Sequence, residues 1–212
     1  MIYNAKSELI ANRGQQNEYN LPDGSLVSMN AESKISYNQK DFLEKRKVSF
    51  EGEAFFNIKK GNKFCISTNN AEIQILGTSF NVYARDTSFK VSCFTGKIKV
   101  ISGDQSVIII PGESAIFEDK ILRKFSEKNI NIVANWRNGE FYFENASLTL
   151  VFKEIERQFN VTFVMPNVDK KYFTGSFSNK NLIDALDIAC IPMGLTYEIG
   201  INSKVFIHEK LR

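Results

Sequence analysis

The sequence is short of cysteine and histidine and has no long hydrophobic run. Its only histidine is His208, and its three cysteines are Cys65, Cys93 and Cys190. Thiols so few and so widely separated exclude a disulfide scaffold and a C-x-x-C metal site. We interpret them as small buried hydrophobic residues, and a Cys65–Cys93 disulfide stays open as the alternative. No window approaches 18 apolar residues, and the first residues lack the basic-then-apolar order of a signal peptide.

Neither sign of charge predominates in the sequence. The chain has 27 basic and 24 acidic side chains, and its net charge is +3. The run Lys45–Lys47 follows Asp41 and Glu44, so acids interrupt the basic residues. A nucleic-acid-binding surface needs a continuous basic stripe, so we expect no nucleic-acid partner. With 43% hydrophobic residues and 18 phenylalanines among 212 residues, the composition is that of a globular protein, and the length favours two domains.

Short alternating runs fill the N-terminal part of the chain. They recur at roughly 8–12-residue spacing with turn residues between them, as in an all-β sandwich or stacked sheet. We therefore predict an N-terminal β domain over residues 17–130, without helices, preceded by a linker at residues 1–16. The runs are Ser25–Met29, Lys47–Glu51, Ala71–Leu76, Phe89–Cys93, Lys97–Ile101 and Val107–Ile110.

The hydrophobic period changes after Trp136. Apolar residues follow the i, i+3, i+4, i+7 spacing of an amphipathic helix from Leu148 to Phe159, and again from Leu182 to Ala189. The strand-like runs around them predict a small α/β domain over residues 131–212. These runs are Val161–Met165, Tyr172–Phe177, Leu195–Ile199 and Lys204–His208.

The C-terminal part matches itself at an offset of 34 residues, so that Leu148 corresponds to Leu182 and Phe163 to Tyr197. Each copy has the order strand, helix, strand, which predicts duplicated β-α-β units. A helix with one apolar stripe must bury it against a neighbour. We therefore expect both helices to pack on one face of a shared small sheet.

Six segments of the N-terminal part resemble the FecR family. The segment Leu76–Val82 is the most specific of them, and Trp136–Phe143 with the duplicated unit resembles the small C-terminal domain of many FecR-like proteins. That domain is similar to the signalling modules of secretins and outer-membrane receptors. The six segments, in order, are Leu21–Ser25, Asn30–Ser33, Val48–Ile58, Ile75–Val82, Phe94–Val100 and Pro111–Glu113.

The resemblance implies a periplasmic part of a transmembrane anti-sigma regulator, with Met1 added ahead of it. Such a regulator receives a signal from the N-terminal signalling domain of a TonB-dependent outer-membrane receptor. It then changes the activity of an extracytoplasmic-function (ECF) sigma factor, through a cytoplasmic segment and an inner-membrane helix that lie upstream. The receptor's cargo, an iron chelate or a glycan, cannot be read from the sequence. We expect a binding protein with no enzymatic activity towards substrates, no cofactor and no metal.

Two other classes of function stay open. A carbohydrate-binding or carbohydrate-processing β-sandwich is one, because Glu51 and Glu53 would project from one face of a strand. Neighbours on one strand rarely face each other across a sugar, so this pair is a poor glycosidase dyad. A structural periplasmic adaptor is the other class.

The Gly77–Thr78 peptide bond is a candidate for self-cleavage, because the resemblance includes regulators thought to cleave themselves at this motif. A threonine hydroxyl can attack the preceding carbonyl, and glycine leaves that carbonyl uncrowded. The structural alternative is that Gly77 permits a bend and Thr78 satisfies local backbone groups.

For partner binding we predict the strand Lys204–His208. A terminal strand often lies at a sheet edge, where a partner can add a strand of its own. Lys204 and His208 would guard that edge against aggregation, and Phe206 would lie between them. A plain core strand is the alternative.

Overall fold

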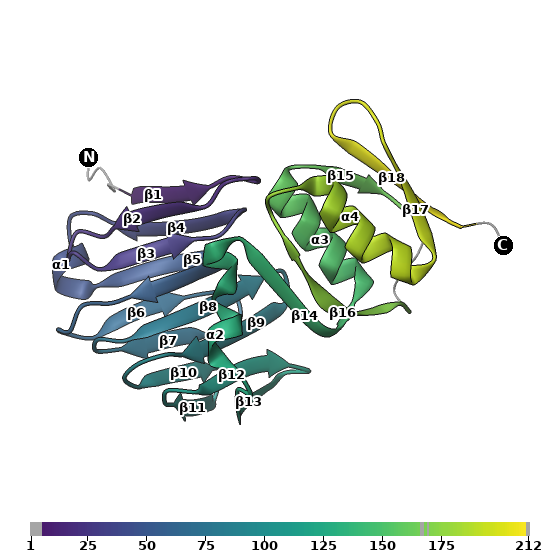
Figure 1. The fold of residues 1–212 in the computed structure, drawn as a ribbon. Coiled ribbons are helices and arrows are strands. Elements are labelled where there is room, and N and C mark those ends of the chain that lie inside the picture. Colours follow the sequence, from purple (N-terminus) through teal and green to yellow (C-terminus); the bar gives the residue numbers. More distant parts are fainter. Residues whose placement is uncertain (1–5, 166–167, 169, 211–212) are drawn as a thin grey trace. The chain divides into compact units, whose positions relative to one another are not determined.

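The chain folds into two compact units. A computed structural model describes residues 6–165, 168 and 170–210. Unit 1 comprises residues 1–134 and unit 2 residues 135–212. Figure 1 shows that unit 1 consists mainly of strands, whereas unit 2 contains the two longer helices. The prediction of a β-rich protein with a large sheet and few helices is confirmed.

Unit 1 contains 13 strands and two four-residue helices in its described residues. The strands are β1 (Lys6–Ala11), β2 (Asn17–Asn20), β3 (Leu26–Met29), β4 (Ser33–Asn38), β5 (Lys47–Asn57), β6 (Phe64–Ser67), β7 (Glu72–Ile75), β8 (Ser79–Arg85), β9 (Ser88–Cys93), β10 (Ile98–Ser102), β11 (Gln105–Ile109), β12 (Glu113–Glu118) and β13 (Ile121–Ser126). The helices are α1 (Phe42–Lys45) and α2 (Ile130–Val133).

Strand β5 belongs to two half-sheets. Its first half pairs with β4 and β6, which continue to β1 on one side and through β7 and β10 to β11 on the other. Its second half pairs with β3 and β8, which continue to β2 and through β9 and β12 to β13. The strand changes partners at Gly52, whose φ is +117°. A Cβ atom there would lie 2.6 Å from Cα of Ser33, so only glycine fits.

Alternating side chains build one core from both half-sheets. Along β5 every second residue is buried, and the ring of Phe56 stacks on Phe80 of β8 with centroids 5.3 Å apart. Phe50 meets Phe56 edge-on, also at 5.3 Å. The outermost strands β11 and β13 are joined by the side chain of Gln105. It donates to the carbonyl of Lys120 and accepts from the amide of Leu122.

Two expectations for unit 1 are wrong. Residues 6–11 are not a linker, because they form β1 and pair with β4 along its whole length. The region expected to lack helices contains α1, which is too short to show a helical period in the sequence. Its Phe42 is buried and lies edge-on to Phe64, with ring centroids 6.1 Å apart.

Among its described residues, unit 2 contains two α-helices, two 3-10 helices and two small sheets. Both helices predicted from apolar stripes are present, as α3 (Leu148–Phe159) and α4 (Leu182–Cys190). The other elements are the 3-10 helices η1 (Asn135–Asn138) and η2 (Ile191–Met193) and the strands β14 (Glu140–Ser147), β15 (Thr162–Val164), β16 (Tyr172–Ser178), β17 (Leu195–Ile199) and β18 (Lys204–Glu209).

The prediction that both helices pack on one shared sheet is wrong. Strands β14 and β16 form one sheet, and β15, β18 and β17, in that order, form another. Helix α3 contacts both β14 and β15, α4 contacts both β16 and β17, and the helices pack on each other. A helix that packs on two sheets buries more than one narrow stripe, which periodicity alone does not show.

The two helices begin and end with matching caps. Ser147 and Asn181 are the N-caps, and their side chains accept from the backbone amides of Leu150 and Ile183. Left-handed residues follow the helical segments at Asn160 and Gly194, with φ of 50° and 69°. The members of each pair lie 34 residues apart in the sequence.

A buried ion pair ties three loops of unit 1 together. Nε and Nη2 of Arg46 donate to Oδ2 of Asp23 at 2.9 and 2.7 Å, and both side chains are at most 10% exposed. The guanidinium also donates to the carbonyls of Lys59 and Asn62. It lies 5.4 Å from the ring centroid of Phe64. One arginine therefore holds the turn before β3, the end of α1 and the loop before β6.

Replacing Asp23 with alanine should lower the free energy of unfolding by about 3–5 kcal/mol, because the buried guanidinium loses its counter-charge. The matched control is Asp41→Ala, which removes the exposed pair between Asp41 and Lys45. It should cost less than about 1 kcal/mol. Urea unfolding followed by circular dichroism measures both values. Equal losses in the two variants would contradict the assigned role of the Asp23–Arg46 pair.

Candidate functional site

The strand predicted for partner binding is central and not at an edge. Strand β18 pairs with β15 on one side, parallel, and with β17 on the other, antiparallel. The prediction that this strand is an edge strand is therefore wrong, because Lys204, Val205 and Phe206 already have strand partners on both sides. The free edges of this sheet, among the described residues, belong to β15 and β17.

The three predicted residues do share one surface. Lys204, Phe206 and His208 alternate with the buried Val205 and Ile207, so they project from the opposite face of the sheet. An open groove of about 810 Å³ lies on this face. Its lining includes Phe206 and His208 but not Lys204; the full lining is Val164, Met165, Thr196, Phe206, Ile207, His208, Glu209 and Lys210.

The sequence did not point to Val164 and Met165 as groove residues. Both lie in the run predicted as a strand, but their position beside Phe206 depends on the parallel pairing of β15 with β18. About 40 residues of sequence separate these strands, and no local signal specifies that pairing.

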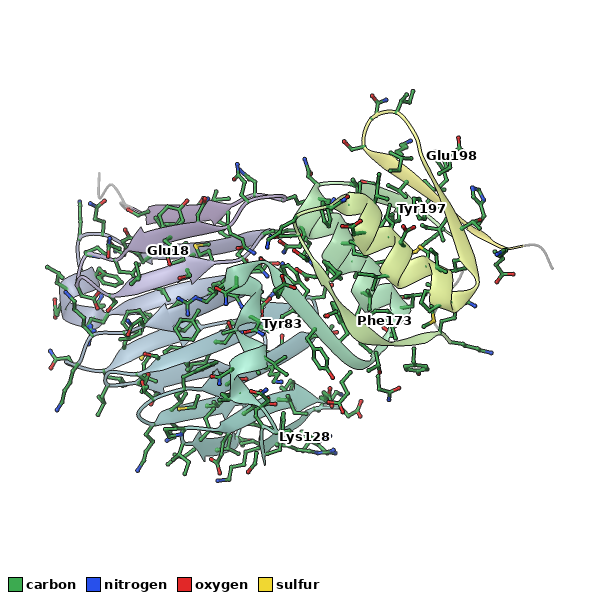
Figure 2. All side chains as sticks on the ribbon, in the orientation of Figure 1. Glu18, Tyr83, Lys128, Phe173, Tyr197 and Glu198 are labelled. Carbon is green, nitrogen blue, oxygen red and sulfur yellow. The ribbon has the colours of Figure 1, made fainter. Side chains whose placement is uncertain are left out.

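Helix α4 and strand β17 are joined by a side-chain hydrogen bond. Oη of Tyr197 donates to Oδ1 of Asp187 at 2.7 Å. This bond, with smaller contributions from burial and charge, raises the pKa of Tyr197 to about 12. The phenol therefore stays protonated at neutral pH and keeps β17 against the helix (Figure 2).

The Gly77–Thr78 bond lies in the connection from β7 to β8. A Cβ atom on Gly77 would lie 2.6 Å from Cα of Lys60, so the close approach of two backbone segments requires glycine there. The segment is held by backbone bonds from the amide of Ile58 to the carbonyl of Thr78 and from Gly61 to Leu76, each 2.9 Å.

The Thr78 side chain does not satisfy local backbone groups, contrary to the structural alternative. Only 4% of the residue is exposed, and its Oγ1 has no hydrogen-bond partner within the described part of the chain. Buried hydroxyls without a partner are rare and costly. The hydroxyl belongs to the residue directly after the Gly77 carbonyl. An N-to-O acyl shift at this bond requires a hydroxyl in that position.

Other candidates for chemistry occupy structural positions. The carboxylate of Glu53 accepts from the side-chain amides of Asn30 and Asn81 at 2.9 and 3.0 Å. Within the described ranges, no group of three or more His, Cys, Asp or Glu side chains could hold a metal ion. None of the helices described here is long and apolar enough to span a membrane.

All three cysteines are free and buried, so the Cys65–Cys93 disulfide is not formed. Burial is the largest cause that raises the pKa of each thiol, to about 11 for Cys93 and about 12 for Cys190. Thiols with such values are neutral and unreactive at neutral pH.

Comparisons with known proteins identify the class of regulator to which this fold belongs. A family model for the FecR protein matches residues 7–99, and a model for the FecR C-terminal region matches residues 140–207. The chain therefore belongs to the FecR family, and both units are covered by its models. None of the curated proteins with which the chain was compared matches it.

Two solved structures have the same fold over almost the whole chain. Both are crystal structures of a candidate anti-sigma factor from Parabacteroides distasonis, at 2.50 and 1.65 Å resolution. Each is 29% identical to this chain and covers 96% of it, with 99% of its own chain aligned. The TM-scores are 0.87 and 0.86.

Replacing Thr78 with valine should leave the free energy of unfolding unchanged or raise it by about 1 kcal/mol, because a buried hydroxyl without a partner is removed. Thr68→Val is the matched control. Its hydroxyl bonds the carbonyl and the amide of Ala71, so this variant should lose about 1–2 kcal/mol. Urea unfolding measures both. A loss at Thr78 as large as that at Thr68 would show that the Thr78 hydroxyl has a stabilising partner.

Proposed function

We propose that the chain is the periplasmic part of an inner-membrane-anchored anti-sigma regulator. It receives a signal from the N-terminal signalling domain of a TonB-dependent outer-membrane receptor and relays it to an ECF sigma factor. The membrane and the sigma factor are reached through an upstream helix and a cytoplasmic segment, which are not among the residues of this sequence. Support comes from the FecR models on both units and from the likeness to the Parabacteroides protein.

In this proposal the two units are separate domains with separate tasks. Unit 2 carries duplicated β-α-β units, which the matching helix caps at the 34-residue offset support. Unit 2 has an open groove on its three-stranded sheet. We therefore take unit 2 as the candidate for receiving the signalling domain.

The observation that carries the docking proposal is the outer face of β18. Lys204, Phe206 and His208 project from it, and the groove beside them offers apolar contacts from Val164 and Phe206. Apolar side chains with charged residues around them are typical of protein–protein interfaces.

Reversing the charge at this face tests the proposal. The double variant Lys204→Glu, His208→Glu should weaken binding of the receptor's purified signalling domain about tenfold. The reason is that the new carboxylates make negative a face whose charge should complement that of the partner. The control Lys99→Glu changes an exposed lysine of unit 1 and should bind like wild type. Isothermal titration calorimetry measures the dissociation constants. Unchanged affinity in the double variant would show that this face does not contact the signalling domain. Absence of binding by the wild-type chain would contradict the relay proposal.

We also propose that the chain cleaves itself between Gly77 and Thr78. The Thr78 oxygen attacks the Gly77 carbonyl carbon, the C–N bond breaks, and the nitrogen takes the hydroxyl proton. Water then hydrolyses the ester to a Gly77 carboxylate and restores the Thr78 hydroxyl, with a free amine at Thr78. The buried, unpartnered Oγ1 of Thr78, directly after the Gly77 carbonyl, supports this step.

Intact-mass spectrometry after incubation at pH 7–8 checks the cleavage. Wild type and the Thr68→Val control should yield fragments 1–77 and 78–212, which stay associated because β7 and β8 belong to one core. Thr78→Ser should still cleave, and Thr78→Val should remain a single chain. One undivided mass for the wild type after prolonged incubation would exclude cleavage of this chain.

A further inference from the structure

The outward face of α4 and the first residue of η2 carry three exposed isoleucines. Ile183, Ile188 and Ile191 are all exposed, and Ile191 is the most exposed of the three at 64%. At 100° per residue these positions fall within a sector of about 140°, opposite the buried Ala185, Leu186 and Ala189. Exposed isoleucines gathered on one helix face are unusual for a surface without a partner.

The same part of the chain is acidic, although the whole chain has a net charge of +3. Residues 181–203 contain Asp184, Asp187 and Glu198 and no lysine, arginine or histidine, so this stretch carries a charge of −3. Asp184 and Asp187 lie in the sector of the exposed isoleucines. Glu198 lies on β17, which runs beside α4 (Figures 1 and 2). Because Tyr197 faces the helix and Glu198 is paired with Phe206, the Glu198 side chain projects from the other face of the sheet.

Strand β17 also offers a free sheet edge next to this face. The amide of Lys210 bonds the carbonyl of Gly194, and the amide of Gly200 bonds the carbonyl of Lys204. Hydrogen-bonded pairs alternate in an antiparallel ladder, so the residues bonded to β18 are Thr196 and Glu198. The main-chain groups of Leu195, Tyr197 and Ile199 therefore face away from β18, and no described strand pairs with them.

The tip beyond this edge continues the apolar surface. Ile199 and Ile201 are exposed, Ile201 at 83%. Asp187 ties β17 to α4 through Tyr197, so the strand edge and the helix face keep a fixed relation. We name the set Ile183, Asp184, Asp187, Ile188, Ile191, Leu195, Tyr197, Glu198, Ile199 and Ile201 the α4–β17 surface.

We propose that the α4–β17 surface receives an extended segment of the receptor's signalling domain, one that carries both apolar and basic residues. The segment adds a strand to β17. On the helix side its apolar side chains cover the isoleucines of α4 and a lysine or arginine faces Asp184 and Asp187, and on the other side of the sheet a basic side chain faces Glu198. The inference rests on the proposed function, because the partner is the same signalling domain. It adds a contact at the β17 edge to the one proposed on the outer face of β18.

Two surface variants and two controls test the proposal by calorimetry with the purified signalling domain of the receptor. Asp184→Lys should raise the dissociation constant about three- to tenfold, and the change should shrink at high salt. Ile191→Ser should raise it about tenfold, because an exposed isoleucine that becomes covered contributes apolar burial. The controls Leu150→Ser and Glu140→Lys change exposed residues of α3 and β14 and should bind like wild type.

Hydrogen–deuterium exchange of the wild-type chain supplies a readout that does not depend on any variant. On addition of the signalling domain, the amides within residues 195–199 should gain protection, because a new strand bonds the outward-facing groups of Leu195, Tyr197 and Ile199. Matching thermal melts check that the variants are folded.

Each outcome decides between the two proposals. Loss of affinity in both variants with protection at 195–199 supports strand addition at β17. Wild-type binding without that protection overturns it and leaves the relay function standing, most directly if only Lys204→Glu, His208→Glu binds weakly. A wild-type chain that does not bind the signalling domain overturns the relay function and the surface together.

Discussion

The architecture of unit 1 depends on the passage of β5 from one half-sheet to the other at Gly52. Ser33 occupies the space that a Cβ atom of residue 52 would need, so the strand can pass there only because that residue is glycine. The Ser33 hydroxyl donates to the carbonyl of Glu53 and accepts from its amide, which satisfies the backbone at the turn. The Glu53 carboxylate then bonds Asn30 and Asn81. Glu53, a candidate catalytic carboxylate in the sequence, therefore stabilises the point at which β5 passes from one half-sheet to the other.

The two units use their apolar residues differently. Unit 1 closes its core between the half-sheets, and the side chain of Gln105 joins the outermost strands through their backbone groups. Unit 2 covers its helices with two small sheets and leaves isoleucines of α4 and a groove beside β18 exposed. Exposed apolar side chains and a free strand edge provide contacts for a partner.

Much of the candidate site could be found in the sequence, but its arrangement could not. Gly77 and Thr78 were identifiable because their chemistry depends on adjacent residues. The unpartnered state of the Thr78 hydroxyl was not, because it depends on which groups the fold brings near it. Lys204, Phe206 and His208, the candidates chosen from the sequence, lie on one face of β18. Their strand was wrongly placed at an edge, since order within a sheet does not follow order in the chain.

The sequence by itself determined the local elements of this protein: the alternating runs, the helices α3 and α4, and the family motifs. These depend on contacts within a few residues, so periodicity and turn chemistry reveal them. Only the tertiary structure decided that β1 joins the sheet, that β18 is central, and that α3 and α4 pack on two sheets. Each of these depends on pairing between segments distant in the chain, and many pairings satisfy the same pattern of apolar residues. The exposed face of α4 and the free edge of β17 belong to the second kind.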